Sequence, residues 1–190
     1  MTSINNEDLQ KIFLNIEQSL DICFVGLEGI ENGYKNTPED TVIPFVLQID
    51  KLPTVRSYII KSLYIFLAST FEEYVLNIIT KFFSDNKELS NSEDNFYTKF
   101  SRLVKKINCD DLNKKIIVLK VMLIVRNYIV HGDSELKLSK NDLDILSNDD
   151  SFKQIKINYE KKHYNKDDIL CFLCVCRDVC SSIDSFTKVI

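Results

Sequence analysis

Apolar residues recur at every third or fourth position over long stretches of this chain, and this spacing restricts the fold more than any other feature. Side chains spaced in this way lie on one face of an α-helix. The spacing starts at Asn5 and stops near Gly33, and a second stretch starts at Pro53, a residue compatible with a helix start, and continues to Phe82. Four glycines and three prolines are all that the 190 residues contain. We therefore expect two long helices in the first half of the chain.

Three further helices are predicted in the second half. Phe96–Ile107 has four inward-facing apolar positions, and residues 167–190 repeat the helical spacing to the end of the chain. Residues 111–131 are rich in isoleucine and valine, which also suit a strand. About twenty residues without a turn signal favour a helix there, with Gly132 as its left-handed C-cap.

Between the last two predicted helices the pattern changes. Phe152, Ile155, Ile157 and Tyr159 follow a nearly alternating pattern, which is typical of a strand. With 45% apolar residues the chain can bury one substantial core. The sequence therefore predicts an all-α fold with one domain over residues 1–190. We expect a helical bundle of four to five long helices, with a small extended or hairpin segment before the last helix.

Membrane insertion and secretion are not expected. The first ten residues are polar and acidic, unlike a signal peptide. The longest apolar run, residues 116–125, has about ten residues and contains a lysine, whereas a bilayer needs roughly twenty. We expect a cytoplasmic protein without membrane contact.

Four of the six cysteines lie close together, at Cys171, Cys174, Cys176 and Cys180. On a helix these side chains point in different directions, so they do not converge on a metal ion. We expect small buried hydrophobes with free thiols, and neither a metal nor another cofactor.

The polar residues of the most apolar predicted helix gather near its end, in Arg126-Asn127-Tyr-Ile-Val-His131-Gly-Asp133. At about 100° per residue, His131 lies about 40° from Asn127 and about 140° from Arg126. A cation, an amide and an imidazole within about two helical turns can hold a phosphodiester and transfer protons on it.

Basic residues are concentrated just before this motif. Between Lys99 and Arg126 there are eight basic residues and two acidic ones, a net charge of +6 in a chain of net charge −4. We expect Lys114, Lys115 and Lys120 to contact the phosphates of a substrate, in which case binding weakens steeply with salt. The alternative is an ordinary solvated face of a lysine-rich helix.

RNA is a substrate that this residue set can cleave without a metal ion. The reaction needs a base for the ribose 2′-hydroxyl, a group that stabilises the charge of the phosphorane, and an acid for the leaving 5′-oxygen. We expect His131 to transfer protons, Arg126 to bind two phosphate oxygens, and Asn127 to bind a phosphate oxygen or orient the imidazole. The expected products are a 2′,3′-cyclic phosphate and a 5′-hydroxyl.

The motif resembles the R-x4-6-H signature of the HEPN superfamily, with Arg126, Asn127 and His131 followed by Gly-Asp133. The stretch Phe71-Glu72-Glu73 is similar to the "Phe-Glu" helix of ribonuclease-type members. The resemblance implies a helical, metal-independent endoribonuclease with a composite active site in a homodimer, found in toxin–antitoxin and anti-phage systems. In one branch a partner nucleotidyltransferase modifies a tyrosine two residues after the histidine. Asp133 occupies that position here, so we do not expect this control.

Supporting roles and other functions stay open. Glu72 or Glu73 is expected to orient Arg126, or both are ordinary exposed acids. His163, in a Lys-Lys-His-Tyr sequence before the last helix, is an exposed side chain or part of a small basic and aromatic RNA contact. The alternatives to a nuclease are a non-catalytic RNA-binding or dimerisation module and a helical regulatory partner, such as an antitoxin, of another protein.

Overall fold

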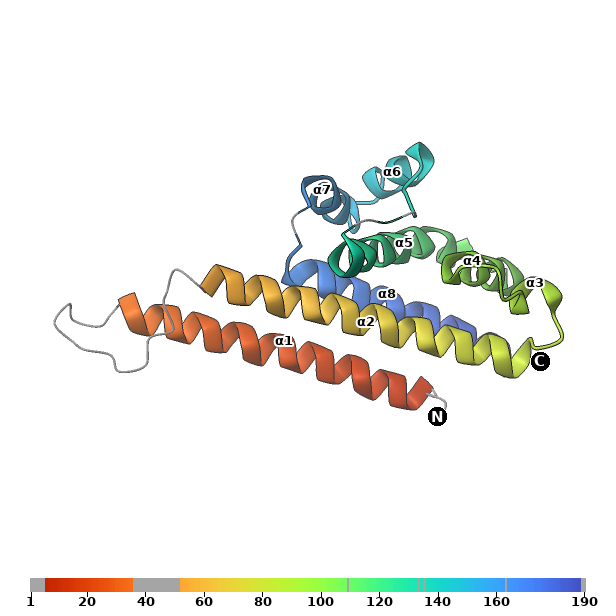
Figure 1. Cartoon of the computed structure of the whole chain (residues 1–190), viewed down its shortest axis with the longest axis horizontal. Helices are drawn as coiled ribbons and strands as arrows, with labels where there is room; N and C mark the ends of the chain where they lie inside the picture. The colour runs from red at the N-terminus through yellow and green to blue at the C-terminus, as the bar shows by residue number, and fades with distance from the viewer. Residues whose placement is uncertain are drawn as a thin grey trace.

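The computed structural model describes residues 6–35, 52–108, 110–132, 134, 136–162 and 164–188, and these residues form eight α-helices (Figure 1). The predicted all-α bundle is confirmed, and the five helices expected from the sequence are α1, α2, α4, α5 and α8, with bounds close to those predicted. The helices are α1 (Asn6–Lys35), α2 (Leu52–Phe82), α3 (Lys87–Ser90), α4 (Phe96–Ile107), α5 (Asp110–His131), α6 (Lys140–Ser147), α7 (Lys153–Lys161) and α8 (Lys166–Thr187).

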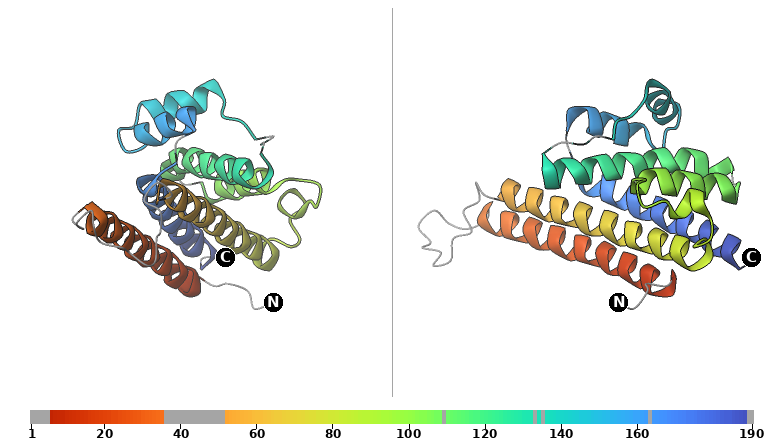
Figure 2. Two further views of the ribbon diagram at one scale, coloured as in Figure 1. Left: turned by 60° about the vertical axis from the view of Figure 1, so that its left-hand side comes forward. Right: turned by 45° about the vertical axis from the view of Figure 1, so that its right-hand side comes forward.

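The helices are arranged in layers around α2 and α8. Helix α1 covers one side of this pair, and α5 covers the other (Figures 1 and 2). The short helices α6 and α7 lie against the outer side of α5, and α4 also packs on it. Helix α5 is therefore surrounded on most sides, which is why its middle is apolar all round rather than amphipathic.

Burial follows the predicted spacing in α1 and becomes nearly continuous in α5. In α1 the buried residues are Leu9, Phe13, Ile16, Leu20 and Leu27. In α5 every residue from 116 to 119 and from 121 to 125 is buried. The branched side chains that resembled a strand thus fill a helix at the centre of the bundle.

Aromatic side chains connect α2 to α4 in the core. The Phe71 ring is fully buried and meets the rings of Phe96 and Phe100 edge-on, with a centroid distance of 5.3 Å to Phe100. Such edge-to-face pairs stabilise beyond the burial of their area. This packing fixes the face of α2 on which the next residue, Glu72, is carried.

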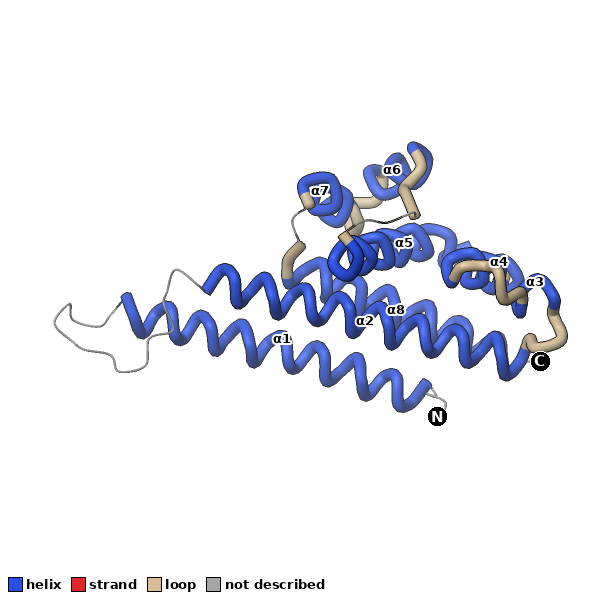
Figure 3. Tube along the Cα trace, viewed as in Figure 1, coloured by secondary structure: helices blue, strands red, loops and turns tan. Residues whose placement is uncertain are grey.

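The predicted strand over residues 152–159 is wrong, because this segment forms α7, and Figure 3 shows helices and loops throughout the described part of the chain. The helix buries Ile155 and Asn158, while Phe152 and Tyr159 are half-buried. The spacing of three or four residues places these four side chains on one face of a helix. The apolar residues Ile155, Ile157 and Tyr159 also alternate, as in a strand. In a segment of nine residues the two patterns are not separable from the sequence.

A buried polar group connects α7 to the start of α8. Asp168 is 3% exposed, and its carboxylate accepts a hydrogen bond of 2.9 Å from the Asn158 amide. It also accepts from the backbone N–H of Asn165, whose own side chain accepts from the N–H of Asp168. This reciprocal capping box fixes the N-terminus of α8 against α7.

Candidate active site at the end of helix α5

The Arg126 side chain on α5 is held by Glu72 on α2. A guanidinium nitrogen of Arg126 donates a short hydrogen bond to the Glu72 carboxylate. The two side chains are 20% and 26% exposed, so the pair lies at the edge of the core and remains open to solvent. The adjacent Glu73 is exposed. Of the two acidic residues expected to orient Arg126, Glu72 is therefore the one that contacts it.

A groove of about 420 Å³ opens beside this ion pair. Arg126 and Asn127 line it together with Glu72, and Phe96 and Tyr97 of α4 form part of its wall. The Arg126 Nε atom is buried without a hydrogen-bond partner among the described residues. The structure therefore brings the predicted cation and amide into one concave, polar site.

His131 is the last residue of α5 and its side chain is exposed. It is not among the residues that line the groove of Arg126. Gly132 follows with φ 76° and its N–H bonds the Tyr128 carbonyl at 3.0 Å, which confirms the predicted left-handed cap. Within one chain, the imidazole and the guanidinium thus stand on different faces of the helix end.

The three lysines predicted to bind phosphate are paired with carboxylates of this chain. Lys114 bonds Asp149 at 3.2 Å, and Lys115 bonds Asp178 at 2.8 Å. Lys120 bonds Asp142 at 2.8 Å.

The Lys120 and Asp142 pair is the most enclosed of the three, with side chains 12% and 14% exposed. Burial raises the pKa of Asp142, but hydrogen bonds from Lys120 and from Ser139 outweigh it, so this pKa lies below its usual value. The charges of these three lysines are therefore matched by carboxylates from distant parts of the sequence. This finding leaves Lys120 little capacity to contact a substrate.

Asp133, expected to support the motif, and His163, expected to be exposed or to contact RNA, cannot be compared with the structure. Asp133 and His163 lie outside the described residues.

The structure also places motif residues where the sequence did not predict a site. Tyr128 and Ile129 line a separate, larger groove together with Lys162 and Tyr164. The basic and aromatic residues 161–164 were the sequence signal for this second surface.

Five of the cysteines lie in the described part of the chain and all five are free. Cys176 and Cys180 are buried, as predicted, whereas Cys174 is exposed and Cys171 is half-buried. Burial raises the pKa of Cys171 to about 11, which keeps its thiol protonated at neutral pH. In the described ranges we find no cluster of three or more His, Cys, Asp and Glu side chains arranged for a metal ion.

Comparison with models of protein families, with curated proteins and with solved structures finds no match to this chain. Among the described residues, no helix has the length and apolar character that crossing a bilayer requires.

Proposed function

We propose that this chain is a metal-independent endoribonuclease of the HEPN type, with Arg126, Asn127 and His131 as its catalytic residues. The observation that carries the proposal is the open groove of about 420 Å³ that Arg126 and Asn127 line together. A structural arginine needs no concave, solvent-open site, whereas an arginine that binds a phosphate does.

The proposed reaction is an internal transfer at phosphorus. A base removes the proton of the ribose 2′-hydroxyl, and the 2′-oxygen forms a bond to phosphorus. The bond from phosphorus to the 5′-oxygen breaks, and an acid protonates that oxygen. Arg126 and Asn127 stabilise the charge on the non-bridging oxygens, and imidazoles transfer the protons.

The reaction requires two copies of the chain, because one imidazole does not serve as base and acid in the same step. His131 is exposed and lies outside the Arg126 groove of its own chain. In a two-fold homodimer the ends of both α5 helices can face one shared cleft, so that two imidazoles and two guanidiniums surround a single phosphate. The composite site therefore accounts for the separation of the two side chains.

The decisive experiment is RNA cleavage in excess EDTA by the parent protein and by Arg126→Ala and His131→Ala. We expect chelator-resistant cleavage to cyclic phosphate and 5′-hydroxyl ends, with each variant slower by about a hundredfold or more. Matched controls are Arg177→Ala, which removes another inter-helix Arg–Glu pair, and Val130→Ala, the exposed neighbour of His131. Both controls should stay within about twofold of the parent protein.

The proposal fails if His131→Ala cleaves as fast as Val130→Ala, or if chelator abolishes cleavage. It also fails if sedimentation finds a monomer that retains full activity. For the biological setting we propose a cytoplasmic enzyme of a toxin–antitoxin or anti-phage system, with an antitoxin or regulatory partner. Growth arrest on expression of the parent chain, and no arrest with His131→Ala, tests this setting.

The second candidate is a non-catalytic RNA-binding or dimerisation module. The engagement of Arg126 by Glu72 favours it, because the carboxylate already occupies part of the guanidinium. RNA that is bound and remains intact in EDTA supports this module over the nuclease.

A further inference from the structure

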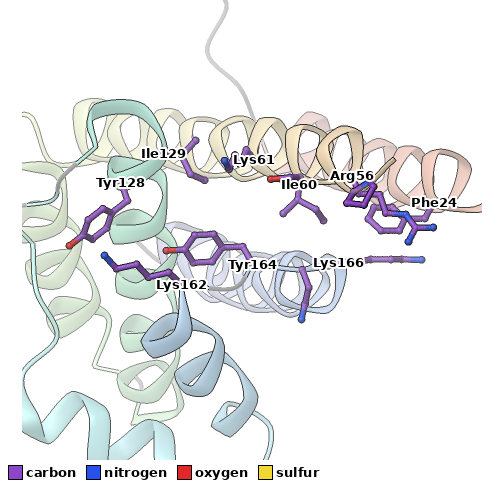
Figure 4. Close-up of a pocket in the computed structure, with 12 residues that line it drawn as sticks. Phe24, Arg56, Ile60, Lys61, Tyr128, Ile129, Lys162, Tyr164 and Lys166 are labelled. Atoms are coloured by element: carbon purple, nitrogen blue, oxygen red, sulfur yellow. The ribbon is translucent and has the colours of Figure 1, made fainter. Parts of the chain in front are cut away.

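A groove of about 770 Å³ lies where the end of α5 meets the first turns of α2 and α8 (Figure 4). It is larger than the groove of Arg126 and falls within the size range of ligand sites. Tyr128 of α5, Lys61 of α2 and Lys166 of α8 contribute to its lining, and Phe24 of α1 reaches its far end.

The charge of this groove is of one sign. Its lining contains four cationic side chains, Arg56, Lys61, Lys162 and Lys166, and no acidic one. Like charges gathered in a concave surface focus the field and attract anions. The groove is therefore suited to a ligand with more than one negative charge.

Two of these cations have carboxylate partners outside the lining, and two have none among the described residues. Arg56 bonds Glu31 at 3.0 Å, and Lys166 bonds Asp21 at 2.7 Å. Asp21 is 61% exposed, so solvent screens its pair with Lys166 and the pair contributes little free energy. Lys61 and Lys162 form no ion pair within the part of the chain that the structure describes.

Aromatic rings accompany the cations at both ends of the groove. The Lys162 ammonium lies 5.2 Å from the Tyr128 ring centroid, and the Lys166 ammonium lies 5.7 Å from that of Phe24. Tyr164 stands between these two ends (Figure 4), and its ring packs edge-on against Tyr64 at 5.6 Å. Rings alternating with cations are the combination with which proteins hold unpaired bases and their phosphates.

From this combination we infer that the groove binds a segment of single-stranded RNA, with phosphates along the cations and unpaired bases against the rings. The inference rests on the proposed function, because the bound segment would be the part of the RNA substrate next to the bond that is cleaved. Tyr128 precedes His131 by about one helical turn. A strand seated in the groove therefore passes the end of α5 where His131 is exposed.

The test is fluorescence anisotropy with a labelled 2′-O-methyl RNA of roughly eight nucleotides. This probe lacks the 2′-hydroxyl and is not cleaved, so binding is measured apart from catalysis. The variants are Lys61→Glu and Tyr128→Ala. The matched control is Lys81→Glu, an exposed lysine twenty positions further along α2 and about 30 Å from Lys61.

We expect both groove variants to raise Kd by at least about fivefold, and Lys81→Glu to leave it unchanged. Lys61→Glu should also reduce the slope of log affinity against log salt by at least about 0.7, whereas Tyr128→Ala should leave the slope unchanged. Two competitors should displace the probe poorly. A duplex of the same sequence has its bases paired, and inorganic polyphosphate has no bases.

The inference is overturned if Lys61→Glu and Tyr128→Ala bind the probe as the control does, or if polyphosphate competes as well as the single strand. Because Lys61 is exposed, Lys61→Glu tests the groove even if Tyr128→Ala is poorly folded. If the parent protein cleaves natural RNA but the groove variants bind the probe as the parent does, the inference is wrong and the nuclease proposal stands. If the groove variants weaken probe binding but the parent protein cleaves no RNA, the inference stands and the nuclease proposal is wrong.

Discussion

Replacing Glu72 by alanine should destabilise the protein and misplace Arg126. The Glu72 carboxylate accepts a charge-assisted hydrogen bond from the guanidinium, and the two residues come from different helices. The variant leaves a cation at the edge of the core with its Nε atom buried and without a partner among the described residues. Both the inter-helix contact and the orientation of the guanidinium are lost.

The expected loss of unfolding free energy is about 1–2 kcal/mol. A hydrogen bond to a charged group is worth about 1.5–3 kcal/mol when buried, whereas a fully exposed ion pair is worth about 0–1 kcal/mol. Side chains that are 20% and 26% exposed lie between these cases. For a chain of 190 residues this loss lowers Tm by about 2–8 °C.

The assay is urea unfolding of the parent protein, Glu72→Ala and Glu73→Ala, followed by circular dichroism. Glu73 is the matched control, because it is adjacent and exposed, and its variant should stay within about 0.5 kcal/mol of the parent protein. Cleavage by Glu72→Ala should also fall by about tenfold or more at a temperature where it is fully folded. Equal stability of the two variants would refute the role of Glu72 as the holder of Arg126.

Two further predictions concern the polar groups that position the helices. Asp168→Ala removes the capping box of α8 and leaves the buried Asn158 amide without its carboxylate, so it should cost about 2–4 kcal/mol in urea unfolding. A loss below about 1 kcal/mol would contradict this assignment. Asp142→Asn should cost about 1–2 kcal/mol at pH 7 by leaving Lys120 without its partner. Because the pKa of Asp142 in the folded protein lies below its usual 3.8, the carboxylate stabilises the fold above that pH and loses this effect as pH falls further. The difference between variant and parent should therefore stay constant from pH 7 to about pH 5 and shrink as pH falls below 3.8. A difference that does not shrink below pH 3.8 would show that the carboxylate charge is not involved.

The helices were predictable because their signals are local. Apolar spacing in α1, the proline near the start of α2 and the glycine after α5 are each set by a few neighbouring residues. Length resolved the ambiguity in α5, where branched residues fit either structure. Length did not resolve it in α7, where nine residues satisfy both periods and only packing against α5 and α6 selects the helix.

The charge pattern was less informative than the apolar pattern. The sequence predicted that Lys114, Lys115 and Lys120 face a ligand, whereas each is paired within the chain. The partner of Lys120 lies 22 positions away and that of Lys114 lies 35 positions away. Residues separated by 22 or more positions can lie side by side or far apart in the folded chain. The distribution of charge along the sequence therefore does not predict which lysines have a carboxylate partner.

The amino-acid sequence by itself determined an all-helical bundle, and it contains the residues that we propose for a phosphodiester site at the end of α5. Side-chain periodicity and helix capping act over a few residues and need no tertiary contact. Only the tertiary structure decided that Glu72 holds Arg126, that His131 stands outside their groove, and that Lys61 and Tyr128 share a second groove. These relations depend on how α1, α2, α5 and α8 pack, and packing joins side chains from distant parts of the chain.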